Sequence, residues 1–340
     1  MNSILSLFDE NFAADLFKER ILPRYPNFKK VKKVKISPIK KNVWEEAYHV
    51  VIEYEVSFID DKKRVQRLPI FCSAHDSEPR KNVYTALKFL WNNGFSQGYL
   101  TVPRPLFYSN RFNAVFYRGV KGHNLFYYIC EKNYPEIERI VNKSALWLAK
   151  LHKAPTDNAL NFNKANSRIE TVVPGKKHIL SVIGERYPEY LSLLEEAFNI
   201  VISREKKFLN ASRRRWIIHG DAHPENVIKI GHKKMAFIDF TDICLSDFTR
   251  DIGSFLQQLE YKCRRRIGDK EFTEKIKNIF LSAYFKNSEI KMGDAIAERI
   301  ATYYNWTALR TAVYLLLKHD PNPERAAELL EEVKDNILRT

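Results

Sequence analysis

The stretch from Trp216 to Phe240, WIIHGDAHPENVIKIGHKKMAFIDF, constrains the fold more than any other part of the sequence. It begins with a short apolar run and continues into a polar loop, HGDAHPEN. Two further apolar runs, 227–230 and 235–238, are separated by Gly231-His232-Lys233-Lys234. Two strand-like runs joined by a few turn residues that include glycine predict a β-hairpin.

The open end of this predicted hairpin gathers oxygen-bearing side chains. A four-residue loop would pair Ile230 with Met235 and so place Asn226 opposite Asp239. Directly opposed residues of an antiparallel pair have Cβ atoms about 4.5–5.5 Å apart. An amide oxygen and a carboxylate would thus lie side by side, with Asp221 on the loop that precedes them. Such hard oxygen ligands suit Mg²⁺.

The spacing of these residues carries a family resemblance. Asp221 and Asn226 have the D-x-x-x-x-N spacing of a kinase catalytic loop, and Asp239 follows where kinases keep a second metal-binding Asp. With His219 and His223, the stretch resembles the aminoglycoside phosphotransferase and choline kinase family. The signature of that family is H-G-D-x-H-x-x-N followed by a strand that ends I-D-F or I-D-W. This sequence carries every position of it.

The resemblance implies an α+β protein with a two-lobed, protein-kinase-like fold. A small antiparallel-sheet lobe that binds nucleotide is expected over residues 1–118, and a larger, mostly helical catalytic and substrate lobe over 119–340. Alternating apolar residues predict strands, and one apolar stripe predicts a helix over 79–92. The expected strands are 31–39, 48–58, 64–72, 100–108 and 113–120. An opening helix is expected at about 8–22.

Beyond Gly122 the pattern becomes helical. Apolar residues spaced by three or four predict a helix that ends in LAKLH, and further helices are expected over 176–208. The polar stretch 157–175 predicts a surface loop. Four more helical stretches follow the hairpin, and Asp251 in the first of them is expected to fix the H-G-D loop.

The resemblance also implies roles in phosphoryl transfer. Asp221 would accept the proton of an attacking hydroxyl or orient it, and Asn226 and Asp239 would hold one or two Mg²⁺ ions. His219 would organise the loop, and His223 would support Asp221 or contact a phosphate. The chain is thus predicted to be an enzyme, a phosphotransferase with an alcohol group as acceptor.

The nucleotide is expected at the link between the lobes. Members of the family read the adenine edge with backbone groups there, so ATP is the expected phosphate donor, with GTP as an alternative. Aligned on Gly122, the link consists of Tyr117, Arg118, Gly119 and Val120.

One expected residue is missing. Kinases carry a phosphate-binding Lys on the third strand, but here that strand reads RLPIFCSAH, with Cys72 and Ser73 at the expected place. Arg80, early in the following helix, could replace it, and Arg67 and Lys81 are alternatives. If none does, the protein would bind nucleotide weakly, or its substrate and phosphate geometry would differ. The missing Lys also leaves a second hypothesis open, a kinase-fold pseudoenzyme or a binding module for an anionic partner such as RNA.

A third interpretation treats His219-x-Asp221-x-His223 as a metal-hydrolase site. Such a site needs further His or carboxylate ligands on later strands. The later half of the chain reads as helical and offers only His232 and His319. The hydrolase interpretation is therefore the weakest of the three.

The chain is strongly basic, with a formal net charge of +15. Basic clusters attract anions, although most charged runs are simply solvated faces. A polycationic acceptor fits this charge poorly, so a neutral hydroxylated or sugar-like acceptor is expected; nucleic acid is not favoured. The clusters are Lys29, Lys30, Lys32, Lys33, Lys35, Lys40 and Lys41, then Arg213–Arg215 and Arg264–Arg266.

The aromatic stretch ATYYNWTALRTAVYLLLKH offers one candidate for the acceptor site. On a helix Tyr303 and Trp306 would share a face, while Tyr304 would point elsewhere. The pair either packs in the core or forms an aromatic wall for the acceptor.

Other features point to the cytoplasm. No secretory signal is expected in the first residues, and no apolar run approaches the ~18 residues of a membrane span. The four cysteines form no C-x-x-C pair, which is consistent with a reducing compartment.

Overall fold

The structure, a computed structural model, describes residues 3–78, 80–156 and 162–337. They form two compact units. Unit 1 runs to Gly122 and also contains the later segment Ile228–Thr241. Unit 2 contains His123–Val227 and the chain from Asp242 onward. The predicted domain boundary between residues 118 and 119 stays a prediction, and it did not foresee the return of 228–241 to unit 1.

Unit 1 is built on an antiparallel sheet whose strand order is β1-β2-β3-β6-β5. Burial alternates along β2, so that Val50, Ile52, Tyr54, Val56 and Phe58 face the core. This alternation explains why the predicted antiparallel meander is correct. The strands are β1 (Phe28–Val43), β2 (Tyr48–Asp60), β3 (Val65–His75), β5 (Arg104–Ser109) and β6 (Ala114–Arg118).

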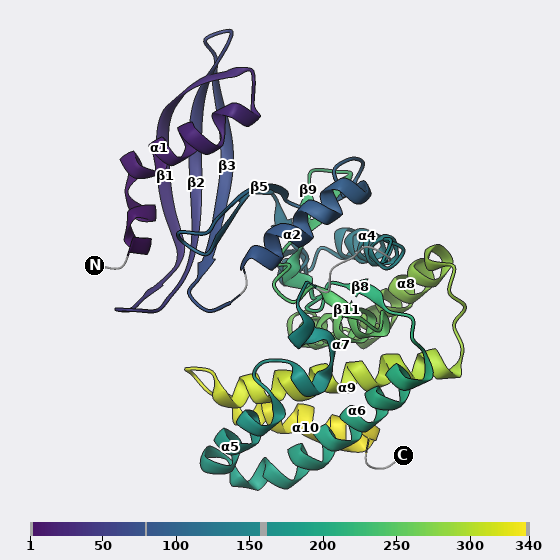
Figure 1. Ribbon diagram of the computed structural model, residues 1–340. Coiled ribbons are helices and arrows are strands. Elements are labelled where there is room, and N and C mark those ends of the chain that lie inside the picture. Colours follow the sequence, from purple (N-terminus) through teal and green to yellow (C-terminus); the bar gives the residue numbers. More distant parts are fainter. Residues whose placement is uncertain (1–2, 79, 157–161, 338–340) are drawn as a thin grey trace. The chain divides into compact units, whose positions relative to one another are not determined.

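Short helices complete this part of unit 1. Helix α1 (Glu10–Arg20) begins where the Asp9 side chain accepts a hydrogen bond from the backbone N–H of Phe12. It lies along the first three strands (Figure 1), and its Phe17 ring packs against Tyr54. Helix α2 follows β3 and continues into a π-turn, where Gly94 adopts a φ of 92°. The remaining elements are η1 (Ser3–Phe8), η2 (Leu22–Arg24), α2 (Arg80–Leu90) and η3 (Trp91–Phe95).

The predicted hairpin is present as β9 (Val227–Ile230) and β10 (Lys234–Phe237), with β4 (Leu100–Thr101) on the far side of β10. The predicted four-residue loop is wrong, because Lys234 already belongs to β10 and the turn is residues 231–233. Gly231 in this turn has a φ of 62°, which glycine adopts without strain. The register that would place Asn226 opposite Asp239 was counted from the four-residue loop and loses its basis, because Asn226 ends a 3₁₀ helix and Asp239 lies beyond the end of β10.

Unit 2 is mostly helical, as predicted, with four long helices after the hairpin (Figure 1). The predicted loop over 157–175 lies partly outside the described residues, and its later part forms two short 3₁₀ helices. The helices are α3 (Leu125–Cys130), α4 (Tyr134–His152), α5 (Lys176–Arg186), α6 (Leu191–Ala211), α7 (Thr249–Arg266), α8 (Lys270–Ser288), α9 (Asp294–Leu317) and α10 (Pro323–Ile337). The short elements are β7 (His123–Asn124), η4 (Lys164–Ser167), η5 (Ile169–Thr171), η6 (Pro188–Tyr190), β8 (Trp216–Ile218), η7 (Pro224–Asn226) and β11 (Cys244–Ser246).

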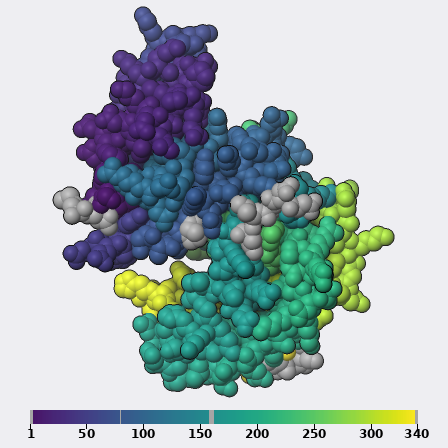
Figure 2. All heavy atoms as spheres, in the orientation of Figure 1, coloured from purple at the N-terminus to yellow at the C-terminus, as the bar shows by residue number. Residues whose placement is uncertain are grey.

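The lysine cluster near the start lies on β1, an edge strand of the first sheet. All seven of its lysines are exposed, and the purple atoms of this segment lie at the surface in Figure 2. Charged side chains on an edge strand oppose pairing with other chains. This position gives the cluster a structural reason that needs no anionic partner.

The state of the cysteines and the character of the helices were both part of the prediction of a cytoplasmic protein. All four cysteines are free thiols, and Cys130 is the exposed one. Among the described residues, no helix has the length and apolar character needed to span a membrane.

Candidate active site

The H-G-D loop leaves the short strand β8 in unit 2. This strand pairs antiparallel with β11, Ile218 beside Cys244, and its residues are buried. Gly220 then adopts a φ of 84°, and a Cβ atom there would lie 2.2 Å from the carbonyl oxygen of Asp242. Both observations require glycine at this position.

A buried carboxylate fixes this loop. The Asp251 side chain accepts hydrogen bonds from the backbone N–H groups of His219 (2.7 Å) and Gly220 (2.9 Å). It also lies 3.1 Å from Nε2 of His152, whose Nδ1 lies 2.7 Å from the Tyr284 hydroxyl. Burial raises the pKa of Asp251, but its partners, His152 foremost, bring the net pKa below the ordinary value. The predicted supporting role of Asp251 therefore has a geometric basis.

Asp221 extends from the fixed loop with a side chain that is 52% exposed. Burial of its surroundings raises the pKa, but the hydrogen bond and charge of His223, with His219 and Arg310, hold it well below the ordinary value. The carboxylate is therefore ionised at neutral pH, as a proton acceptor must be.

His223 orients this carboxylate. Its Nδ1 accepts a hydrogen bond from the backbone N–H of Glu225 (3.2 Å), so the ring proton must be on Nε2. Nε2 lies 3.3 Å from Oδ2 of Asp221 and thus points its N–H at the carboxylate. The sequence left open whether His223 supports Asp221 or contacts phosphate, and this geometry favours support.

Asn226 closes the same loop. The side chain is 6% exposed, and its Nδ2 donates to the carbonyl oxygen of Asp221 at 3.0 Å. With the nitrogen engaged, the amide oxygen is the atom that can serve as a metal ligand, which fits Mg²⁺. Among the described ranges of the chain, no group of three or more His, Cys, Asp or Glu side chains could hold a metal ion. The metal-hydrolase interpretation stays a hypothesis.

Asp239 lies in unit 1, two residues after the end of β10, and has a φ of 61°. This left-handed conformation is uncommon for residues other than glycine and often marks functional positions. Its Oδ1 accepts a hydrogen bond from the Thr241 hydroxyl (2.8 Å). The same hydroxyl accepts one from Nη1 of Arg80 (2.9 Å). Asp239 is thus linked through Thr241 to the cation that was expected to replace the missing Lys.

Arg80 is 4% exposed at the start of α2, and its Nη2 lies 2.9 Å from a carboxylate oxygen of Glu78. A buried, paired cation on the helix after β3 parallels the Lys–Glu pair of kinases. The alternatives, Arg67 and Lys81, are both exposed. Of the three candidates, Arg80 alone combines burial with a link to Asp239.

The predicted nucleotide link begins at the end of β6. Tyr117 stacks on Phe71, with ring centroids 5.9 Å apart, and burial and then the charge of Asp239 raise its pKa. The backbone N–H of Gly119 donates to the carbonyl of Pro69 (2.9 Å), so a different backbone group of the link must donate to a nucleotide base. A Cβ atom on Gly119 would lie 2.5 Å from the Phe71 ring. The four predicted link residues otherwise stay a prediction.

Of the two alternatives for the Tyr303–Trp306 pair, core packing or an aromatic wall, the structure favours core packing. Tyr303 and Trp306 do share a face of α9, with centroids 6.5 Å apart, but they are 0% and 4% exposed and belong to the unit 2 core. The Tyr303 hydroxyl donates to the buried Glu205 at 2.9 Å. The choice between core and wall could not be made from helical spacing, since both place the two rings together.

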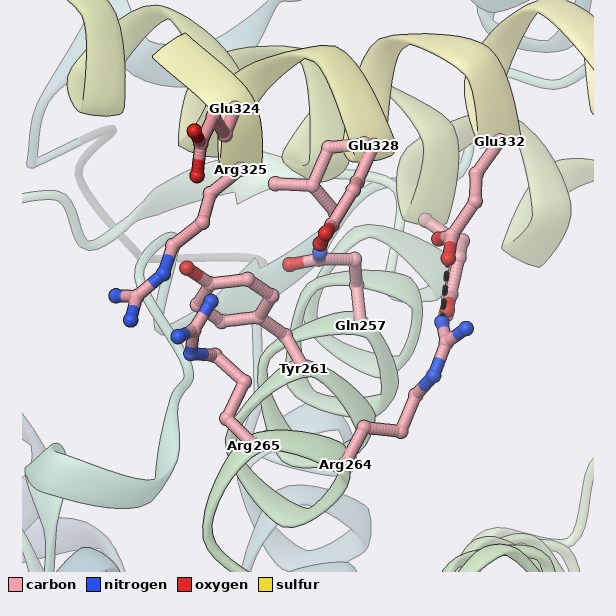
Figure 3. Close-up of a pocket in the computed structure, with 10 residues that line it drawn as sticks. Gln257, Tyr261, Arg264, Arg265, Glu324, Arg325, Glu328 and Glu332 are labelled. Carbon is pink, nitrogen blue, oxygen red and sulfur yellow. Dashed lines mark hydrogen bonds and ion pairs between the residues drawn. The ribbon is translucent and has the colours of Figure 1, made fainter. Parts of the chain in front are cut away.

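A separate cavity of about 350 Å³ lies among α7, α9 and α10. Figure 3 shows the ends of Arg265 and Arg325 gathered beside the ring of Tyr261, while Arg264 pairs with Glu332 at 2.6 Å. No residue of the H-G-D loop lines it. It is therefore distinct from the loop that carries Asp221.

Residues 59–291 match the family model described as the phosphotransferase enzyme family, APH. The chain belongs to this family. No curated protein sequence matches it significantly. It is thus a phosphotransferase that acts on a hydroxyl group, that is, a kinase, and this prediction is confirmed.

Solved structures share the fold. Spectinomycin phosphotransferase APH(9)-Ia has a TM-score of 0.58 at 11% identity, covering 97% of this chain and 98% of that one. Choline kinase LicA from Streptococcus pneumoniae has a TM-score of 0.56 at 15% identity, covering 96% and 99%. Choline kinase from Cryptosporidium parvum Iowa II has a TM-score of 0.64 at 10% identity, covering 97% and 95%. The predicted two-lobed, kinase-like α+β fold is confirmed.

Proposed function

We propose that this phosphotransferase moves the γ-phosphate of ATP to a hydroxyl group of a small metabolite, with Mg²⁺ as cofactor and Asp221 as the base. The observation that carries the proposal is the state of Asp221: exposed, ionised and oriented by His223 on a loop that Asp251 fixes. Phosphoryl transfer depends on positioning and charge more than on covalent chemistry. Asp221 would orient the acceptor hydroxyl and take its proton.

The nucleotide would be held by unit 1 residues and by metal ligands. Arg80 would bind the phosphates in place of the missing Lys, and the backbone of residues 117–120 would bind the base. Asn226 and Asp239 would hold Mg²⁺, which when bound neutralises phosphate charge. In support, similar folds were solved with ADP in spectinomycin phosphotransferase and with AMP-PNP and Ca²⁺ in amicoumacin kinase. GTP is the alternative donor.

We place the reaction in the cytoplasm with a small-molecule acceptor. The four free thiols fit a reducing compartment. The lysine cluster lies on an edge strand, and members of the two arginine clusters contact other side chains of the chain, for example Arg264 with Glu332 and Arg214 over Trp216. This favours a small acceptor over RNA as the partner.

The variant Asp221→Asn tests the proposal. We expect transfer from labelled ATP into a metabolite pool to fall by ~10²–10⁴-fold, because the base or orienting group is lost. Nucleotide binding and the free energy of unfolding should be little changed. Asp320→Asn, the same change at an exposed loop residue of unit 2, is the matched control and should keep wild-type activity. Near-normal kcat in Asp221→Asn, or no Mg²⁺-dependent ATP consumption by the wild type, would refute the proposal.

A further inference from the structure

Lys40 on β1 is held by a polar partner on the neighbouring strand. Its Nζ lies 3.0 Å from Nδ1 of His49 on β2. Because an ammonium group only donates, Nδ1 must accept, so the ring is neutral and carries its proton on Nε2. Lys41, the next residue, has its Nζ 4.7 Å from the centroid of the Phe8 ring. Successive side chains of a strand point to opposite faces, so the two lysines belong to different faces of the sheet.

The strand register places Lys40 in line with the position of the missing kinase Lys. Lys40 pairs with Val51 of β2, and Val51 pairs with Ser73 of β3. Directly paired residues share a face, so Lys40 and Ser73 face the same side, whereas Cys72 is fully buried on the other. Ser73 is one of the two residues found where a kinase carries its Lys. Lys40 therefore brings an ammonium group to the same face, from two strands away.

A chain of contacts within unit 1 joins Lys40 to Arg80. His49 pairs with His75 of β3, and the centroids of the two imidazole rings are 4.8 Å apart. Nε2 of His75 lies 3.4 Å from Oε1 of Glu78, whose Oε2 lies 2.9 Å from Nη2 of Arg80. Lys40 and Arg80 therefore lie at the two ends of a pair of imidazole rings.

Arg80 has a donor without a partner. Its Nη1 and Nη2 contact Thr241 and Glu78, but its buried Nε bonds to no acceptor within residues 3–78, 80–156 and 162–337. A buried donor left without an acceptor is costly. Lys40 in turn is bonded to a neutral ring, and no carboxylate of the described residues pairs with it. The two cations therefore offer donors that an oxyanion can accept from.

We propose that Lys40, positioned by His49, is a second ligand of the nucleotide phosphates beside Arg80. The inference rests on the proposed function, in which the phosphates of ATP bind at Arg80. On the same face of β3, Phe71 stacks against the predicted base-binding link, and His75 lies toward Arg80. A nucleotide along this face would bring its phosphates to Lys40, whose ammonium group suits phosphate oxygens as a point charge. Two cations from outside β3 would thus do the work of the missing Lys.

Equilibrium binding of adenosine, ATP and inorganic tripolyphosphate at a fixed Mg²⁺ concentration tests this role of Lys40. We expect Lys40→Ala to weaken the binding of ATP and tripolyphosphate by ~10-fold or more, because one charge-assisted contact is lost, and to leave adenosine binding unchanged. Lys40→Arg, which keeps the charge, should retain most of the affinity. Lys41→Ala removes the same side chain from the other face of β1 and is the matched control. It should bind all three probes as the wild type does.

His49→Leu tests the positioning role of His49. It removes the acceptor that holds the Lys40 ammonium group, so it should weaken the binding of ATP and tripolyphosphate by less than Lys40→Ala does. In the Lys40→Ala background it should have no further effect, because the two changes act through one contact. Additive losses would mean that His49 acts on the phosphates independently of Lys40 and would overturn its positioning role.

Three results would overturn the inference. They are wild-type affinity for ATP and tripolyphosphate in folded Lys40→Ala, an equal loss of adenosine binding in that variant, or an equal loss of phosphate binding in Lys41→Ala. The second would make Lys40 structural, and the third would assign the effect to the general charge of β1. A wild type that binds tripolyphosphate through Lys40 but does not bind ATP would refute the proposed donor alone. Because binding needs no turnover, an active Asp221→Asn would refute the proposed base and leave the role of Lys40 standing.

Discussion

The loop of residues 219–226 keeps the kinase-family pattern, whereas the cluster around Arg80 departs from it. The loop carries the family signature at every position, and a buried carboxylate, Asp251, accepts two of its backbone N–H groups. The cluster departs from the kinase pattern, since β3 has no Lys and a cation from the next helix reaches Asp239 through Thr241.

The proposed roles of the loop and of the Arg80 cluster explain why one keeps the family pattern and the other does not. A base must lie at one position and in one protonation state, so its loop is tied down by several buried hydrogen bonds. Phosphates spread their charge over many oxygens, and a cation can meet them from more than one direction. Under the proposed function, Arg80 would therefore take the place of a strand Lys, whereas no other residue would replace Asp221.

The strongest test of the rigid loop is Asp251→Ala. It removes the acceptor for His219, Gly220 and His152 in a fully buried place, so we expect the free energy of unfolding to fall by ~3–5 kcal/mol. Urea denaturation measures it. Asp320→Ala, at an exposed residue, should change it by less than ~0.5 kcal/mol. If Asp251→Ala also changed the free energy of unfolding by less than ~0.5 kcal/mol, the loop would keep its conformation without Asp251.

In the cluster around Arg80, Asp239→Ala should weaken nucleotide binding in the presence of Mg²⁺. Loss of a residue that only supports a metal ligand lowers metal affinity by ~10–100-fold, and loss of a direct ligand should lower nucleotide affinity by more than that. Binding without Mg²⁺ should change little. Titration of nucleotide with Mg²⁺ and with a chelator separates the two. Because Asp239 has a φ of 61°, Asp239→Gly is the control for strain and should show the same loss. Equal losses with and without metal would remove Asp239 as a ligand.

Arg80→Ala should raise the KM for ATP by ~10-fold or more, because one charge-assisted contact to phosphate is lost. Arg67→Ala is the matched control, as an exposed Arg on β3, and should leave that KM unchanged. Steady-state kinetics shows which of the two arginines contacts phosphate, provided that each variant unfolds at the same denaturant concentration as the wild type. An effect in Arg67→Ala alone would move the phosphate contact to the strand.

The smallest effect is expected from His223→Gln. The base must be ionised, so activity rises with pH through the pKa of Asp221, which His223 helps to keep below its ordinary value. Without His223 this pKa rises, and the acid limb of kcat moves to higher pH. For the same reason, the stability that ionised Asp221 gives the wild type is present at neutral pH and lost in acid. An unchanged acid limb in a pH–rate profile would assign Asp221 another partner.

Patterns in the local sequence predicted the strands of the first sheet and the H-G-D loop, because these features depend on neighbouring residues. Period-two alternation identified the meander, as along Tyr48–Asp60, and residue spacing identified the H-G-D loop. The hairpin loop was misjudged because Lys234 has a turn-like polar side chain but sits exposed on a strand. Polarity alone cannot tell an exposed strand residue from a turn residue.

Other features depend on contacts made across the fold. An arginine early in a helix is usually solvated, so nothing in the sequence indicated that Arg80 would be buried against Glu78 and Thr241. The left-handed backbone of Asp239 is likewise invisible to composition. Trp306 is covered by Arg250, more than fifty residues earlier in the chain, and helical spacing does not predict such a neighbour.

Unit 1 consists of two segments that are separated in the sequence, and this separation affects the order in which the chain can fold during synthesis. Strand β4 pairs in parallel with β10, Leu100 beside Met235, and all of residues 123–227 are made between them. Since domains fold as they emerge from the ribosome, β4 waits for its partner until much of unit 2 has been made. A fragment that stopped at Gly122 would lack β10, the strand with which β4 pairs. We therefore expect unit 1 to be complete on its own only when residues 228–241 are joined to it.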